Sequence, residues 1–120
     1  MREIKFRGKA INRKDTWFIG DFRQDSKANE FWIFPHDEYP GVDKHRVDPD
    51  TIGEYSGQSD KNANDLFEGD IVKEGGGSGV IEWDEKYSKF VCRLRAGSSG
   101  LYLQQMKIVG NIHDNPELIK

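Results

Sequence analysis

Four carboxylates of this chain are the residues whose type and placement could support hydrolytic chemistry. They lie in or beside expected strands, at Asp21, Asp70, Glu82 and Asp84. Hydrolases that use two metal ions hold the ions between carboxylates that converge from different elements. Strand alternation, however, puts Glu82 and Asp84 on one face, opposite Ile81 and Trp83, and such a pattern is typical of a solvated strand face. A metal-dependent hydrolase is therefore kept only as a third hypothesis.

Other catalytic arrangements have no counterpart in the sequence. The potential soft-metal ligands stand apart, without the paired short spacings of a zinc site. They are His36, His45, His113 and Cys92. No serine lies in a Gly-x-Ser-x-Gly turn, and the glycine run at 75–79 lacks the Gly-Lys-Ser/Thr ending of a phosphate-binding loop. We therefore expect no enzyme activity, no metal and no cofactor, and we expect Cys92 to be a small buried hydrophobe.

Binding is better supported than catalysis, because cations and aromatic residues recur in the same part of the chain. Lys5, Arg7 and Lys9 alternate with apolar residues, so they share the solvated side of the first expected strand. Small β folds bind single-stranded nucleic acid or peptides through exposed aromatic side chains flanked by Arg or Lys. The candidate binding residues are Lys5, Arg7, Lys9, Trp32, Tyr39 and Arg46. The competing role for the aromatic residues is core formation, so we expect one or two of them to be exposed.

The elements that must position these residues are short strands. Residues 3–22 predict a hairpin around a turn at 12–15, and Phe31–Phe34 predicts a strand that ends at Pro35. Residues 35–50 carry too many backbone constraints for a regular element and predict a long connection. The remaining expected elements are a strand at 50–55, one helical turn at 63–67, a meander of strands at 70–73, 80–83 and 90–94, apolar segments at 101–103 and 106–109, and a short terminal helix from Pro116.

A local pattern of an apolar residue, a glycine and a polar residue recurs at four places. The glycines are Gly20, Gly53, Gly69 and Gly110. Glycine at the start of or within a strand marks a bulge, a positive φ angle or a close backbone approach, and a following Asp or Asn accepts hydrogen bonds from nearby N–H groups. We expect four structural corners, with ligand binding by the acids as the alternative.

Length and charge limit the other options. With 120 residues, the chain has room for one core, and 18 Lys and Arg against 21 Asp and Glu give a net charge of -3. An acidic protein does not bind nucleic acid nonspecifically over its whole surface, but the first fourteen residues are basic and leave a local cationic face. No apolar run approaches membrane-spanning length, and one cysteine fits the reducing cytosol. We predict a mainly β fold, a small barrel-like or packed-sheet single domain over 1–120 with short strands, long loops and at most short helical turns.

Ordered blocks along nearly the whole chain resemble the YopX family. They are Glu3–Lys9, Trp17–Asp21, Val47–Gly57, Asp60–Asn62, Phe67–Val72, Gly79–Asp84 and Ile108–Leu118. The resemblance implies a small β protein encoded by phages and prophages of Gram-positive bacteria, and it implies no particular activity. The sequence departs from the family pattern after Asp60–Asn62, where Ala63 and Asn64 replace a common glycine and lysine. That departure concerns the geometry of the turn.

These observations lead to one main functional hypothesis and one alternative. The main hypothesis is a non-enzymatic phage or prophage accessory protein, a β module that binds a host or phage macromolecule in the cytoplasm of a bacterial host. Protein is favoured over nucleic acid as the partner, no membrane is involved, and unprotected strand edges favour a homo-oligomer. The alternative is a nucleic-acid-binding module that uses the basic N-terminal strand.

Overall fold

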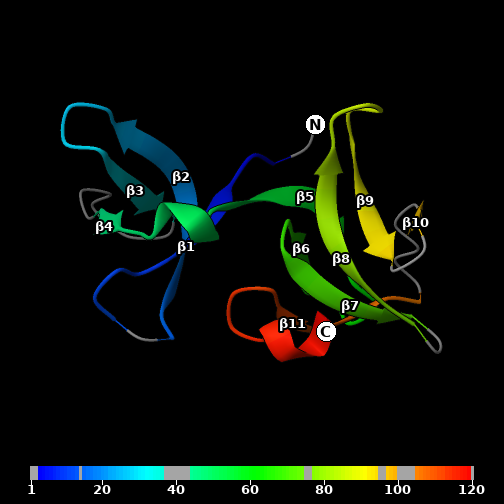
Figure 1. Ribbon diagram of the computed structural model, residues 1–120. Coiled ribbons are helices and arrows are strands. Elements are labelled where there is room, and N and C mark those ends of the chain that lie inside the picture. Colours follow the sequence, from blue (N-terminus) through cyan, green and yellow to red (C-terminus); the bar gives the residue numbers. More distant parts are fainter. Residues whose placement is uncertain are drawn as a thin grey trace. The chain divides into compact units, whose positions relative to one another are not determined.

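The strands form two antiparallel sheets, and the chain divides into two compact units, Met1–Tyr55 and Ser56–Lys120. The computed structural model describes residues 3–13, 15–36, 44–74, 77–94, 97–99 and 105–119 (Figure 1). The mainly β prediction is confirmed. The prediction allowed either a barrel-like or a packed-sheet fold. A closed barrel is not observed, since in the described part of the chain each sheet has two end strands.

The first sheet has the strand order β4-β3-β2-β1-β5-β6, and the first unit contributes all of it up to the start of β5. The elements of this unit are β1 (Phe6–Lys9), β2 (Trp17–Asp25), β3 (Glu30–Pro35), β4 (His45–Arg46), the 3-10 helix η1 (Pro49–Thr51) and the start of β5 (Gly53–Ser59). The predicted hairpin is confirmed by the antiparallel pairing of β1 with β2. The expected connection over 35–50 was wrong in part, because β4 pairs with β3 and η1 is capped by the Asp48 carboxylate.

The first unit's sheet curls so that the end of β1 meets the end of β4. Ala10 forms an isolated antiparallel bridge with Val47, and the N–H of Asp48 donates to the carbonyl of Lys9 at 2.8 Å. The approach is close at Gly8, where a Cβ would lie 2.8 Å from Cγ2 of Val47. Glycine at this position therefore allows the curl.

Curling gives the first sheet an inner and an outer side. Side chains of paired residues lie on the same side of a sheet. Ile33 and Val47 are completely buried on the inner side. The ring of Phe22 packs between two others, 5.6 Å from Phe6 and 6.0 Å from Phe31 between centroids. Because these aromatic rings lie on the inner side, the residues that alternate with them along the same strands lie on the outer side.

The second unit is built on a sheet with the order β10-β9-β8-β7-β11. It contains the rest of β5, then β6 (Asp65–Phe67), β7 (Asp70–Glu74), β8 (Gly77–Asp84), β9 (Lys89–Leu94), β10 (Gly97–Ser99), β11 (Lys107–Asn111) and the 3-10 helix η2 (Pro116–Ile119). The meander β7-β8-β9 and the terminal helical turn confirm two predictions. The helical turn expected at 63–67 was wrong, because Asp65–Phe67 is a strand. The segment 101–103 lies outside the described residues.

The core of the second unit is apolar. Its buried members are Leu66, Val72, Ile81, Phe90, Cys92 and Met106. Cys92 is 2% exposed, which confirms the expected buried thiol. Among the described residues, no helix is long and apolar enough to cross a membrane.

One buried carboxylate organises the turn between β5 and β6. Asp60 is 5% exposed, and its Oδ1 accepts from the N–H groups of Asn62 and Asn64, both at 2.9 Å. Its Oδ2 accepts from the N–H of Ile108 at 3.0 Å, so the turn is tied to β11. Burial by itself raises the pKa of Asp60, but the backbone hydrogen bonds outweigh burial and hold this pKa below the ordinary 3.8.

Candidate functional site

The outer side of the first unit's sheet collects cations and aromatic rings from four strands. Strand pairing fixes this arrangement, because Lys9 faces Trp17 across β1 and β2, and Arg23 faces Trp32 across β2 and β3. Trp32 in turn faces Arg46 on β4, and alternation adds two more residues. We call this surface the aromatic–cationic face, and its members are Arg7, Lys9, Trp17, Arg23, Trp32, Phe34 and Arg46.

Each large ring of the aromatic–cationic face has a cation beside it. The Arg7 guanidinium lies 5.0 Å from the Trp17 ring centroid, and the Arg23 guanidinium lies 5.1 Å from that of Phe34. Lys44, just before β4, has its ammonium 4.4 Å from the Trp32 ring. All three rings are half-buried, so part of each ring reaches solvent. Such pairs are favourable, and they hold the rings in place.

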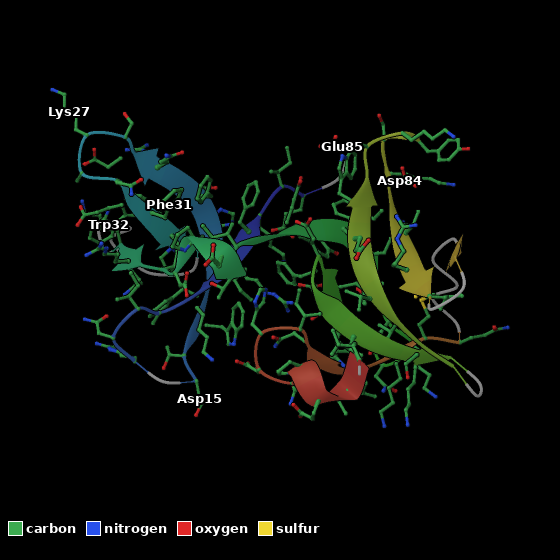
Figure 2. The ribbon with its side chains drawn as sticks, in the orientation of Figure 1. Asp15, Lys27, Phe31, Trp32, Asp84 and Glu85 are labelled. Atoms are coloured by element: carbon green, nitrogen blue, oxygen red, sulfur yellow. The ribbon has the colours of Figure 1, made fainter. Side chains whose placement is uncertain are left out.

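The loops that flank β2 lie at opposite ends of this strand. Figure 2 labels Asp15 in the loop before β2 and Lys27 at the tip of the loop after it, with Trp32 on the neighbouring β3. The second of these loops is ordered by Asp25, whose Oδ1 accepts from the N–H groups of Lys27 and Ala28. This capped turn fixes the end of the β2–β3 hairpin beside the face.

The balance of charge on this side of the sheet is positive, although the whole chain is acidic. The cations are Lys5, Arg7, Lys9, Arg23, Lys44 and Arg46, and the carboxylates beside them are Glu3, Asp21, Asp25 and Glu30. Two of the carboxylates form ion pairs, Glu3 with Lys5 at 3.2 Å and Glu30 with Arg46 at 3.4 Å. In each pair one partner is largely exposed, and screening by solvent weakens the attraction. The face therefore keeps cations that can meet an anionic polymer.

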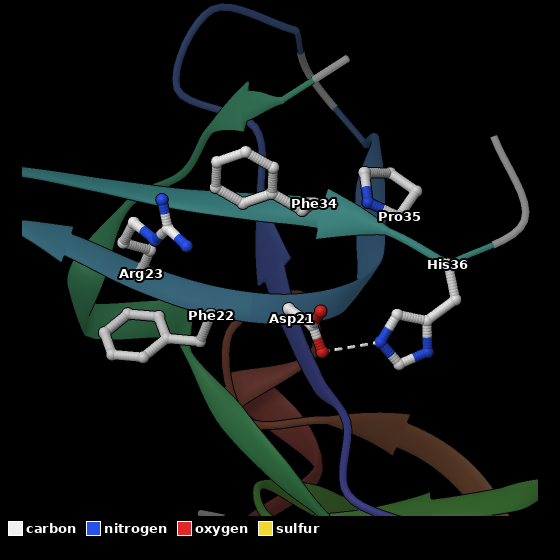
Figure 3. Close-up of a pocket in the computed structure, with 6 residues that line it drawn as sticks. All are labelled: Asp21, Phe22, Arg23, Phe34, Pro35 and His36. Carbon is white, nitrogen blue, oxygen red and sulfur yellow. Dashed lines mark hydrogen bonds and ion pairs between the residues drawn. The ribbon is translucent and has the colours of Figure 1, made fainter. Parts of the chain in front are cut away.

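A pocket of about 460 Å³ lies at one end of the aromatic–cationic face (Figure 3). It is lined by Asp21, Phe22, Arg23, Phe34, Pro35 and His36. His36 Nε2 lies 2.6 Å from Asp21 Oδ1, and both side chains are exposed. Because an ionised carboxylate only accepts hydrogen bonds, Nε2 carries the proton in this contact. Figure 3 shows the Asp21–His36 pair on one side of the pocket and the ring of Phe34 on the other.

A second pocket, of about 690 Å³, adjoins the end of β1. Its lining includes Lys9, Arg13 and Asp48, together with Ala10, Ile11 and Asn12. Lys9 also belongs to the aromatic–cationic face, so the cationic surface continues into this pocket. Two cations against one carboxylate give the pocket a positive balance.

Five of the six binding residues predicted from the sequence lie on this side of the sheet. Lys5, Arg7 and Lys9 follow the alternation of β1, and the pairing of β3 with β4 adds Trp32 and Arg46. Lys5 immediately precedes β1 and has its ammonium 4.6 Å from the Tyr55 ring. Tyr39 lies outside the described residues. That the five residues bind a ligand stays a prediction.

Four residues on this side of the sheet were not among the six binding residues predicted from the sequence. Two of them are cations, and the other two are the aromatic residues Trp17 and Phe34. Arg23 and Lys44 were not among the predicted site residues, although each contacts a ring of the face. The signal for Arg23 was present, since alternation from Trp17 along β2 puts both on the same side. Lys44 carried no such signal because it precedes a two-residue strand.

Each of the four carboxylates of the hydrolase hypothesis has a structural contact, which for Asp21 is the contact to His36. Asp70 is 2% exposed and accepts from the N–H of Phe67 at 2.8 Å. Glu82 pairs with Arg93 at 3.0 Å, and Asp84 caps the β8–β9 turn by accepting from the N–H groups at 86 and 87. Within the described ranges, no group of three or more His, Cys, Asp or Glu side chains could hold a metal ion. The convergence that the third hypothesis, a metal-dependent hydrolase, would require is therefore not observed for these four carboxylates.

The corner prediction is confirmed at Gly69 and Gly110, and the close backbone approach expected of such a glycine is present at Gly20, where a Cβ would meet the carbonyl of Phe34. Gly69 has a φ of 94°, in the left-handed region, and Asp70 after it caps the preceding strand. The pairing of β11 with β7 shifts by a residue before Gly110, and Asn111 Oδ1 accepts from the N–H groups of His113 and Asp114. The polar residues after Gly69 and Gly110 thus stabilise turns.

Comparison with known proteins identifies the family to which the chain belongs. A family model described as YopX protein matches residues 5–120. The chain belongs to the YopX family. The YopX match begins at Lys5 and covers every member of the aromatic–cationic face. Among curated proteins, none matches the chain significantly.

The structure also explains how the turn tolerates Ala63, the residue that departs from the family pattern. This residue has a φ of 65°, a backbone conformation that glycine adopts without strain. The resemblance to the family implies a glycine at this position, and Ala63 keeps the turn conformation although it is less suited to it. The turn survives because Asp60 holds both sides of it through backbone N–H groups.

Proposed function

We propose that this YopX family member is a non-enzymatic binding module that binds single-stranded nucleic acid through the aromatic–cationic face. The observation that carries the proposal is the alternation of half-buried rings with cations on one outer sheet surface. Proteins that bind single strands combine a cationic track for the phosphates with aromatic side chains on which bases stack. A base that stacks beside Trp17, Trp32 or Phe34 brings its phosphate near the cation of that ring.

The spacing of the rings supports a polymer ligand. Trp32 and Phe34 are two residues apart on β3, which separates them by roughly 6–7 Å along the strand. Trp17 lies on the neighbouring β2, paired with Lys9. Several rings in one surface give several stacking positions, and such binding is tolerant of sequence because every base has a π face.

The sequence analysis favoured a protein as the partner, and binding of a protein or peptide is the hypothesis that competes with the present proposal. A peptide-binding surface uses apolar pockets or an unpaired strand edge as its main contact. Here β1, β2 and β3 are each paired on both sides, and exposed cations lie on the outer side of the sheet, among them Arg23 on β2 and Arg46 on β4. Paired strands with cations fit a polyanion better than an added strand.

Binding is tested by fluorescence anisotropy of labelled dT20 and rU20 at 50 mM salt, with a 20-base-pair duplex for comparison. We expect both single strands to bind and the duplex to bind more weakly. Trp32→Leu removes a stacking ring and should weaken binding by about tenfold, which is the order of one base–aromatic contact. Tyr87→Leu is the matched control, since Tyr87 is 63% exposed and has Lys86 5.4 Å from its ring, but lies in the second unit.

The same titration can overturn the proposal. Absence of binding to every oligonucleotide at low salt would do so, as would equal losses in the Trp32 and Tyr87 variants. The oligonucleotides should be recovered intact after incubation with Mg²⁺, because the module is proposed to bind and not to cleave. Cleavage that depends on the protein would contradict the non-enzymatic part.

Three finer predictions stay predictions beside this function. They are a phage or prophage origin, work in the cytoplasm of a bacterial host, and self-association into a homo-oligomer. The buried Cys92 thiol is compatible with a reducing compartment. Sedimentation equilibrium of the purified protein tests the third.

A further inference from the structure

We infer that the pocket of Asp21, Arg23, Phe34 and His36 is a guanine-selective base subsite at the end of the aromatic–cationic face. This inference rests on the proposed function, because it treats the pocket as one position along a bound single strand. The pocket shares Arg23 and Phe34 with the face, so a strand that follows the face reaches it.

The charges of the pocket select against simple ions. Asp21 opposes a phosphate or carboxylate ligand, and Arg23 opposes an ammonium or guanidinium ligand. A neutral planar group with both donors and acceptors on its edge meets neither repulsion. The Phe34 ring offers such a group a stacking surface.

Hydrogen-bonding capacity narrows the choice to one base. The contact to His36 uses Asp21 Oδ1 only, and a carboxylate has about four acceptor sites, so acceptor capacity remains on Asp21. Guanine presents two neighbouring donors, N1–H and the N2 amino group, on its Watson–Crick edge, which match the two oxygens of one carboxylate. Its O6 and N7 atoms are acceptors, and Arg is their usual donor in proteins.

His36 is a positioning residue in this subsite. Its Nε2–H donates to Asp21 Oδ1 and so fixes the orientation of the carboxylate beside the pocket.

The test compares dT11 oligonucleotides whose central base is guanine, hypoxanthine, adenine or thymine. Hypoxanthine differs from guanine by loss of the N2 amino group alone. We expect the guanine oligonucleotide to bind about tenfold tighter than the thymine one, with most of this preference lost for hypoxanthine. Asp21→Asn should abolish the preference for guanine.

Asp84→Asn is the matched control, because it removes the same charge from a turn of the second unit. It should keep the guanine preference in full. Equal affinity for all four oligonucleotides, with binding intact, would overturn the subsite and leave the proposed function standing. A guanine preference that survives Asp21→Asn would also overturn it, and binding of no oligonucleotide would overturn both proposals.

Discussion

Asp60 accepts a hydrogen bond from the backbone N–H of Ile108 across 48 residues of sequence, at 3.0 Å. The same carboxylate accepts from two N–H groups of its own turn, so one side chain fixes the turn after β5 against β11. Local capping by Asp is common, but the bond to a distant strand makes this residue part of the second unit's tertiary structure.

We predict that Asp60→Asn destabilises the second unit by about 1.5–3 kcal/mol at pH 7, the usual loss for hydrogen bonds to a charged group. Asn has one acceptor oxygen and cannot serve both the turn and β11. Urea unfolding followed by circular dichroism measures the difference. Asp65→Asn, at an exposed position of the same unit, is the control, and equal stability of the two variants would contradict the prediction.

The stability advantage of Asp60 should disappear in acid. Its folded pKa lies below the ordinary 3.8, so the unfolded chain binds a proton more readily than the folded one. The contribution is therefore complete above the unfolded pKa and is lost as the pH falls through the folded pKa. The free energies of unfolding of wild type and Asp60→Asn should approach each other as the pH falls below the ordinary pKa of 3.8 and through the lower folded pKa. A gap that stays constant over this range would show that the carboxylate charge is not responsible.

Ala63→Gly should stabilise the protein. Ala63 has a φ of 65°, and the left-handed conformation costs a residue with a Cβ about 1–2 kcal/mol. Glycine removes that strain but gains conformational entropy in the unfolded chain, which offsets roughly 0.5–1 kcal/mol. A net gain of about 0.5–1 kcal/mol is expected by urea titration. Asn at the same position should give a smaller gain, since Asn tolerates this region better than Ala, and a loss of stability with Gly would refute the account.

Gly8→Ala should destabilise the first unit. The new Cβ would lie 2.8–3.0 Å from three side-chain atoms of Val47, which is itself completely buried. Relief requires the end of β1 to move away from Val47 and weakens the Ala10–Val47 bridge, at about 1–3 kcal/mol. The double variant Gly8→Ala with Val47→Ala should recover part of this loss, as a thermal unfolding series would show. No recovery would mean that Val47 is not the obstacle.

The salt dependence of the binding constant should report how many cations of the face contact phosphates. If Arg7, Lys9, Arg23, Lys44 and Arg46 contact phosphates, the slope of log K against log salt for a single strand is about -3.5. Neutralising Lys44 and Arg46 to Gln should reduce its magnitude to about 2.1. Lys86→Gln with Lys89→Gln, the pair beside the Tyr87 ring, should leave the slope unchanged. A slope near zero in the wild type would argue against phosphate contacts.

Local patterns predicted the strands well because period-two alternation is a property of neighbouring residues. The hairpin of β1 and β2 and the meander of β7, β8 and β9 followed from such patterns. The strand β4 has only two residues, and its identity comes from pairing with β3, which no local pattern encodes. The same holds for the Ala10–Val47 bridge, whose partners are far apart in the chain.

The candidate site was predictable to the extent that one strand defined it. Alternation put Lys5, Arg7 and Lys9 on one side without any knowledge of the register. Trp32 and Arg46 joined them only through the pairing of β3 with β2 and β4, since a shift by one residue would have turned both to the inner side. The pocket depends on His36 meeting Asp21 across 15 residues, and sequence gives no distance between them.

The single cysteine, Cys92, allows the opening rate of the second unit's core to be measured by thiol labelling. Its thiol is 2% exposed in the core beside Leu66 and Met106, so a thiol reagent reaches it when that core opens. Each chain then contributes one reaction, and the labelling rate at saturating reagent equals the rate of opening. Oligonucleotide binding on the first unit can be followed on the same sample, which shows whether occupation of the face changes how often the second core opens.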